Sequence, residues 1–128
     1  MEYDLRDIAA QARSRAYAPY SEFLVGAALL SVSGRVFSGC NVENISFGLT
    51  MCAERVCLGN AVQEGERDFQ AITIVSDSEE PVMPCGACRQ VLAEFSPRMN
   101  IISWTVRGAK KEISLATLLP FPRQGILG

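Results

Sequence analysis

Three cysteines and one glutamate stand in two short segments with the spacing of a metal site. The segment TMCAERVC holds Cys52 and Glu54 as C-x-E, and the later segment PCGACRQ holds Cys85 and Cys88 as C-x-x-C. The chain contains no histidine, so metal ligands and a general base must come from other side chains. The cysteines could form a catalytic zinc site, a purely structural zinc site, or a set of buried thiols.

Both segments are expected where a helix begins. Helical patterns are predicted over residues 51–63 and 84–95, and on the second helix Cys85 and Cys88 lie one turn apart on the same face. At a helix N-terminus the unpaired N–H groups and the helix dipole favour anions, which lowers the pKa of a thiol. Three thiolates converging at two helix starts are therefore expected to bind Zn²⁺.

The number of ligands indicates what the zinc does. A structural zinc has four protein ligands, whereas a catalytic zinc has three and keeps one position for water. Cys57 follows Cys52 by five residues and lies about 140° away around the helix, so it faces away from the metal. Cys40 ends a strand, and spacing alone does not exclude it. The prediction is an open, catalytic site of Cys52, Cys85 and Cys88, with the other two cysteines buried as small hydrophobic side chains.

Glu54 and Arg55 complete the expected chemistry. Zinc with three thiolates carries a net charge of −1, which opposes the lowering of the pKa of bound water from about 9 to about 7. Helix N-termini offset part of that charge, and Arg55 is placed to donate hydrogen bonds to the sulfurs. Glu54, beside the metal without being a ligand, is predicted to act as general base and then as general acid.

The rest of the pattern predicts one α/β domain over residues 1–128. Apolar residues at helical spacing indicate a helix over residues 4–17, ended by the Ala18-Pro19 step. The segments FLVGAALLSV and RVFSGCNV read as a strand hairpin, AITIVS and NIISWTV as further strands, and SLATLLP as a closing helix. Gly26 predicts a close approach to the first strand. The element order gives a three-layer α/β/α sandwich with a mixed sheet of about five strands.

Composition excludes several classes of function. The net charge is −2, the sequence pI is about 5.1, and the longest basic run is the pair Lys110-Lys111, which argues against nucleic-acid binding. No apolar run of transmembrane length is present, so no membrane association is expected. The N-terminus does not resemble a signal peptide. Five cysteines in such a chain indicate a reducing compartment, and a cytoplasmic location is expected.

The two motifs match the signature of zinc deaminases, H-x-E…P-C-x-x-C with Cys in place of His, as CAE at residues 52–54 and PCGAC at residues 84–88. With the segments YSEFLVGAALL and GCNVENISFGLTMCAER, the chain from about residue 18 to 120 resembles the small homotetrameric zinc-dependent cytidine deaminases. The resemblance implies their fold, one Zn²⁺ per subunit and a homotetramer. It also implies that zinc-activated hydroxide attacks C4 of cytidine or deoxycytidine while Glu54 shuttles protons, a reaction of pyrimidine salvage.

The resemblance further assigns nucleoside-binding roles by position. Phe23 would pack against the pyrimidine, Asn41 and Glu43 would hydrogen-bond the ribose hydroxyls, and the backbone of Ala53 would meet the base carbonyl. Without the resemblance, Asn41 would be interpreted as an Asx-type turn and Glu43 as a solvated carboxylate. Phe47, also assigned to the substrate side, stands where the family often has Tyr.

The C-terminal segment departs from the family. LLPFPRQGILG stands in place of the usual LLPGAF, so Phe121, the possible cross-subunit residue, comes two places early. Two other functions compete with cytidine deamination. One is a deaminase of a related cytosine nucleoside such as a nucleoside antibiotic, although Asn41 and Glu43 favour a ribose with free hydroxyls. The other is a structural zinc or redox protein, which would have no use for Glu54.

Overall fold

The computed structural model describes residues 2–122. Its elements in chain order are α1 (Glu2–Arg13), β1 (Val25–Ser31), β2 (Val36–Cys40), a short 3₁₀ helix (Phe47–Leu49), α2 (Ala53–Gln63), β3 (Phe69–Ser76), α3 (Gly86–Ala93), β4 (Asn100–Thr105), β5 (Lys110–Ser114) and α4 (Leu115–Leu118). No helix in this part of the chain is long and apolar enough to cross a membrane.

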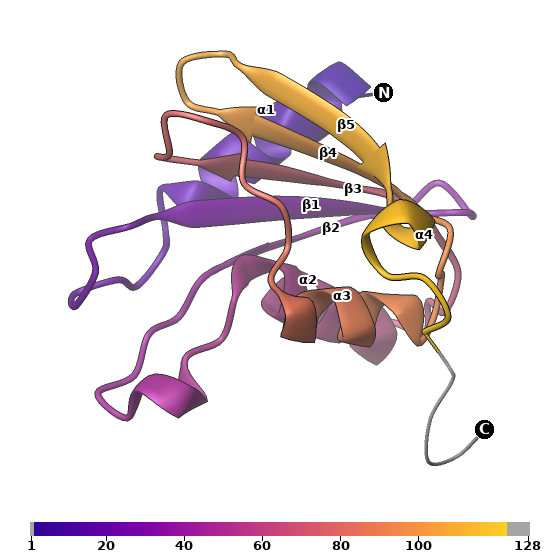
Figure 1. The fold of residues 1–128 in the computed structure, drawn as a ribbon, viewed down its shortest axis with the longest axis horizontal. Coiled ribbons are helices and arrows are strands. Elements are labelled where there is room, and N and C mark those ends of the chain that lie inside the picture. Colours follow the sequence, from indigo (N-terminus) through magenta and orange to yellow (C-terminus); the bar gives the residue numbers. More distant parts are fainter. Residues whose placement is uncertain (1, 123–128) are drawn as a thin grey trace.

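The strands form one five-stranded sheet in the order β2-β1-β3-β4-β5. β3 and β4 run parallel, while the other neighbouring strands pair antiparallel. A parallel pair needs a crossover connection, and α3 supplies it. Helix α1 covers one face of the sheet, and α2 and α3 lie side by side on the other face (Figure 1). The predicted three-layer sandwich with a mixed sheet is confirmed.

Each face of the sheet has its own apolar core because successive strand side chains point to opposite faces. Toward α2 and α3, the strands contribute Ala27, Leu29, Ile72, Ile74 and Ile101. Toward α1, they contribute Ala28, Leu30 and Val75, which pack with Leu5 and Ala9 of the helix. The continuous apolar run of β3 is therefore explained by burial on both of its faces.

Two glycines let helices touch strands backbone to backbone. A Cβ atom on Gly26 would collide with the backbone of Ala9 and Arg13 in α1, so the close approach predicted at this glycine is confirmed. A Cβ atom on Gly39 would lie only 2.6 Å from the Cys57 nitrogen and 2.9 Å from the Ala53 carbonyl oxygen in α2. This second contact fixes α2 against the end of β2.

The predicted starts and ends of two helices were wrong. Helix α1 ends at Arg13 rather than near residue 17, because Tyr17 forms a parallel bridge with Val42. Helix α2 begins at Ala53 rather than Met51, because Met51 forms an antiparallel bridge with the same Val42. These extended pairings join three segments that are distant in sequence, and they bring the residue before Cys52 next to the end of β2.

Candidate active site

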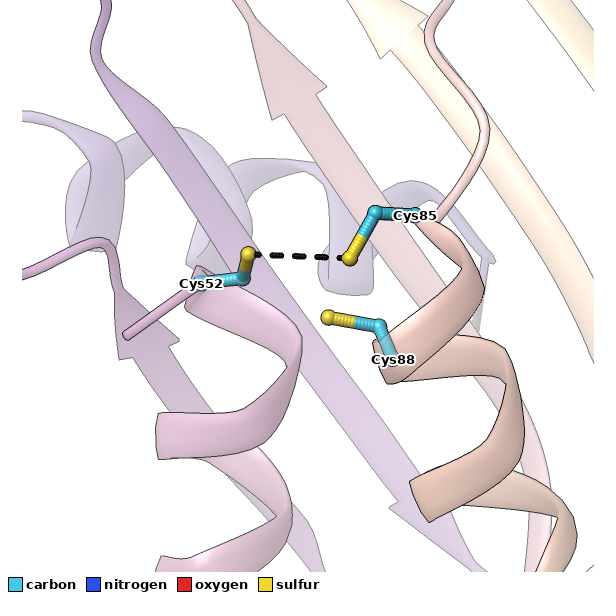
Figure 2. A group of neighbouring side chains, drawn as sticks. All are labelled: Cys52, Cys85 and Cys88. Carbon is cyan, nitrogen blue, oxygen red and sulfur yellow. Dashed lines mark hydrogen bonds between the residues drawn. The ribbon is translucent and has the colours of Figure 1, made fainter. Parts of the chain in front are cut away.

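The structure brings the thiols of Cys52, Cys85 and Cys88 together, with their sulfur atoms within 4.8 Å of one another. The Cys52 and Cys85 sulfurs lie 3.9 Å apart, and Figure 2 shows the three side chains pointing toward a common point. Sulfur ligands about 2.3 Å from a tetrahedral zinc are separated by about 3.8 Å, so this donor set fits the ion.

Helix starts position all three sulfurs, as the spacing predicts. Cys52 is the N-cap residue of α2, Cys85 is the N-cap residue of α3, and Cys88 lies in the first turn of α3. Neither N-cap side chain accepts a hydrogen bond from its own helix, which leaves both sulfurs directed toward the neighbouring helix. The positive ends of two helix dipoles therefore face the same cluster of thiols.

The remaining cysteines lie elsewhere. Cys57 is fully buried, its thiol donates to the Phe37 carbonyl oxygen at 3.1 Å, and burial raises its pKa to about 12. Cys40 lines a small cavity with Ile8 and Ala12 of α1, on the opposite face of the sheet from α2 and α3. Among the described residues, the metal-binding geometry is therefore restricted to the other three cysteines.

Cys52 is the sulfur most strongly stabilised as a thiolate. A hydrogen bond from Cys88 and the nearby Arg55 lower its pKa to about 5, against the opposing effect of burial. The Arg55 guanidinium donates from Nη2 to the Cys52 sulfur at 3.6 Å and to the Thr50 carbonyl oxygen at 3.3 Å. The pKa of Cys88 is raised, because its thiol donates to Cys52 and is itself buried. Arg55 thus lies where the sequence predicted a cation beside the sulfurs.

Glu54 is a buried carboxyl group next to the cluster, with 6% of its surface exposed. Burial raises its pKa to about 7, the negative charge of Cys52 adds to this effect, and Arg55 opposes it. A carboxyl group with a pKa near neutrality can both accept and return a proton at physiological pH. Glu54 is therefore a buried, titratable carboxyl group rather than a surface charge.

Asn41 and Glu43 hold the segment of residues 18–25 in place. The Asn41 amide nitrogen donates to the Phe23 carbonyl oxygen at 2.8 Å, and its Oδ1 accepts from the Val25 N–H at 2.9 Å. The Glu43 carboxylate accepts from the N–H groups of Tyr20 and Ser21 at 3.0 and 3.1 Å, and from the Ser21 hydroxyl. Neither an Asx-type turn nor a solvated carboxylate describes these residues, since both are more than nine-tenths buried.

The aromatic residues expected on the substrate side are largely uncovered. Phe23 is 36% exposed, Phe47 in the 3₁₀ helix 78%, and Phe121 after α4 76%. No ring contact joins any two of them in the described part of the chain. Ala53 is fully buried at the first position of α2, where its N–H has no partner within the helix.

Sequence reasoning missed two residues that shape this region, Ser21 and Asp77. The Ser21 hydroxyl accepts from the Phe23 N–H at 3.0 Å, and the Asp77 carboxylate accepts from the Leu24 N–H at 3.2 Å. Asp77 directly follows the buried strand β3, and a carboxylate at that position is a signal that the sequence offered.

Comparison with known proteins gives a consistent result. The family model described as the cytidine and deoxycytidylate deaminase zinc-binding region matches residues 2–103. A cytidine deaminase of Halalkalibacterium halodurans is 52% identical over 113 residues, covering 88% of this chain and 86% of that protein. One from Sporosarcina psychrophila is 49% identical over 111 residues, covering 86% and 82%. A crystal structure of cytidine deaminase from Burkholderia pseudomallei superimposes with a TM-score of 0.91 at 45% identity, covering 94% of this chain and 98% of that one.

Proposed function

The chain belongs to the cytidine and deoxycytidylate deaminase family, and we propose that it hydrolyses cytidine and deoxycytidine to uridine and deoxyuridine with release of ammonia. The observation that carries this proposal is a buried carboxyl group, Glu54, with its pKa raised to about 7 beside three convergent thiols. A purely structural metal site or a redox site gives no reason for such a carboxyl group.

Cys52, Cys85 and Cys88 would hold one zinc ion per subunit. Zinc, when bound, lowers the pKa of water and so supplies a nucleophile at neutral pH. The protein has to offset the negative charge of three thiolates, and the hydrogen bond from Arg55 to the Cys52 sulfur serves this purpose. The two helix N-termini act in the same direction.

Glu54 would carry the protons that the hydrolysis moves. As a carboxylate it takes a proton from the attacking water, and as a carboxylic acid it returns a proton to the amino group that leaves as ammonia. Both forms are populated near neutral pH because burial raises the pKa of this side chain to about 7.

Asn41 and Glu43 have hydrogen-bonding capacity left for ribose hydroxyls. The Asn41 amide nitrogen has two N–H groups, and one of them is used on Phe23. The Glu43 carboxylate has about four acceptor positions, and three are used within the 18–25 segment. Phe23 would then contact the pyrimidine ring, while the Ala53 N–H at the start of α2 would donate to the base carbonyl oxygen.

We also propose that the chain, as a single domain, assembles into a homotetramer. Ile45, Phe47 and Leu49, called here the 45–49 patch, lie in and just before the 3₁₀ helix and are exposed by 85%, 78% and 67%. Clustered exposed apolar residues mark surfaces that another chain covers. Phe47 and Phe121 would then face an active site of a neighbouring subunit. A role in pyrimidine salvage follows from the proposed reaction, and the five cysteines of the chain support a cytoplasmic location as part of the proposal.

The direct test follows the loss of cytosine absorbance with cytidine, deoxycytidine and 2′,3′-dideoxycytidine. We expect turnover of the first two and at least about tenfold lower kcat/KM for the third, because it leaves buried polar groups unpaired. Equal activity on the dideoxy compound would remove Asn41 and Glu43 from substrate binding. No turnover of any of them would refute the proposal in favour of a modified cytosine nucleoside as substrate.

A further inference from the structure

The 18–25 segment has no regular secondary structure between Tyr20 and Leu24, yet side chains fix its backbone almost residue by residue. Glu43 binds the N–H groups of residues 20 and 21, and Asn41 binds residues 23 and 25. Between these anchors, the N–H of Leu24 donates to Oδ2 of Asp77 at 3.2 Å. Asp77 is therefore a third anchor, and it acts immediately beside Phe23.

The Asp77 carboxylate divides its two oxygens between two partners. Oδ2 accepts from Leu24, while Oδ1 accepts from Nε of Arg13 at 2.6 Å and forms an ion pair with Nη2 of the same guanidinium. Because the guanidinium holds Oδ1 and the Leu24 N–H holds Oδ2, both the position and the orientation of the carboxylate are fixed. About a quarter of each side chain remains exposed, so the pair lies at the edge of the protein interior.

The fold brings these partners together for two reasons. The last antiparallel pair of β1 and β3 is Val25 with Ser76, so Leu24 and Asp77 would form the next pair of the ladder. The side chain of Asp77 replaces the backbone bond that the ladder would have made there. On the other side, the close packing of α1 on Gly26 places Arg13, the last residue of that helix, beside the same strand end.

The backbone next to Phe23 is held in an unfavourable conformation. Glu22 has a φ of 59°, in the left-handed region that residues with a Cβ seldom adopt. Such a conformation persists only where the surrounding contacts over-determine it. Here the Glu22 N–H donates to the Ala18 carbonyl oxygen at 3.0 Å. On its two sides, the Ser21 N–H donates to Glu43, and Phe23 is held through its N–H by the Ser21 hydroxyl and through its carbonyl oxygen by Asn41.

We propose that Asp77, held in orientation by Arg13, is a positioning residue that fixes Leu24 and so sets where the Phe23 ring meets the pyrimidine. This inference rests on the proposed function for its substrate, but its structural part concerns the chain alone. A contact between Phe23 and the base is made equally in the ground state and the transition state. A substitution that displaces the Phe23 ring should therefore raise KM and change kcat little.

The first test compares Asp77→Ala and Asp77→Asn with the wild type. The alanine variant removes both contacts, and we expect KM for cytidine to rise about tenfold with kcat within about twofold. The asparagine variant keeps an acceptor for Leu24 and loses the charge, so a smaller rise in KM is expected. Glu64→Gln is the matched control, because Glu64 pairs with Arg35 at 3.3 Å outside the 18–25 segment, and this variant should leave KM unchanged.

The second test asks whether Asp77 acts through Phe23. In a Phe23→Leu background, Asp77→Ala should raise KM much less than it does in the wild type, because residues that act as a unit are not additive. Additive effects, an equal loss in kcat, or an unchanged KM in the single variant would each overturn the inference.

A measurement without substrate separates this inference from the proposed function. Asp77→Ala should accelerate hydrogen exchange of the Leu24 amide, followed by NMR, while Glu64→Gln should not. If the wild type shows no turnover of cytidine, the proposed function fails, and the exchange rate of Leu24 alone decides whether Asp77 positions this segment. An unchanged exchange rate would overturn the inference whatever the activity.

Discussion

The cluster of thiols and the 18–25 segment are built by different means. Helix starts place the sulfurs, so the position of each cysteine follows from its own neighbours in sequence. The 18–25 segment has no helix or strand of its own between Tyr20 and Leu24. Side chains from the loop after β2 and from the residue after β3 hold it. The thiol cluster therefore depends on where two helices begin, whereas the conformation of the 18–25 segment depends on tertiary hydrogen bonds.

This difference predicts two kinds of failure. Damage at the thiols should abolish the reaction while leaving most of the sheet intact. Damage to the anchors of the 18–25 segment should weaken substrate binding and leave the reaction itself intact. A thiol variant that keeps its activity, or an anchor variant that loses kcat, would contradict this difference between the two regions.

The largest effect is expected from Cys88→Ala, which removes the buried member of the three thiols. With two ligands left, zinc affinity should fall by at least about 100-fold, more than the loss of an outer partner costs, and deamination should fall with it. Zinc content and competition with a chelator provide the measurement. Cys57→Ala is the matched control, since this cysteine is equally buried but outside the cluster, and it should keep its zinc. If Cys57→Ala also loses zinc, the loss in Cys88→Ala would come from the cavity that the substitution leaves in the protein, and not from a missing ligand.

Glu54→Gln should be the next largest in effect. Removal of a general acid–base group costs about 10²–10⁴ in rate, and we expect kcat to fall by about 10³ because glutamine cannot accept the proton. Zinc content should stay at the wild-type level, since Glu54 lies outside the three-cysteine cluster. Steady-state kinetics and metal analysis on the same sample check both parts. A variant that still deaminates cytidine would remove Glu54 from the mechanism.

The sequence predicts the thiol cluster far better than it predicts the 18–25 segment. Local spacing sufficed to place Cys52, Cys85 and Cys88 at two helix starts, since residues three apart at a helix start lie on one face of the helix. The partners of Asn41 depend on the register of β1 against β2, which no local pattern contains. For the same reason the helix starting at Met51 was predicted too early, because its pairing with Val42 is a contact between distant segments.

The assembly can be tested at the 45–49 patch. Leu49→Glu replaces a side chain whose burial is worth about 1.5–3 kcal/mol, so association should weaken by about 10- to 150-fold at each interface. Light scattering should report a smaller mass than for the wild type. Val32→Glu, at a side chain 58% exposed just after β1, is the control and should not change the mass. An unchanged mass for Leu49→Glu would mean that no other subunit covers the patch.

The smallest effect concerns pH and Glu43. Hydrogen bonds from Ser21 and Tyr20 lower the pKa of this carboxyl group from its ordinary value of about 4.5, so the folded chain binds fewer protons there than the unfolded chain. The contribution of Glu43 to the free energy of unfolding is therefore fully present above about pH 4.5. It is lost as the pH falls through the lowered pKa of Glu43 in the folded chain.

Thermal unfolding between neutral and acidic pH should show this contribution. The wild type should lose melting temperature more steeply below about pH 4.5 than Glu43→Gln, which has no charge to lose. The variant should start lower at neutral pH, because an amide cannot accept from all three donors of the 18–25 segment. Parallel curves for the two proteins would show that Glu43 contributes no pH-dependent stability.

Gly26 and Gly39 stand on neighbouring rungs of the β1–β2 hairpin, since Gly26 pairs with Cys40 and Ala27 with Gly39. One meets the backbone of α1 and the other meets the backbone of α2, so a single thickness of strand separates the two helix layers there. Gly26 offers no side chain between β1 and α1, and Gly39 offers none between β2 and α2, so these direct backbone contacts transmit a small displacement as close-packed interiors do. The hairpin acts as a rigid spacer, and a shift of α1 would be transmitted to the first turns of α2, where Cys52 and Glu54 lie. Substitutions that move α1 are therefore expected to shift the start of α2, although α1 lies on the other face of the sheet.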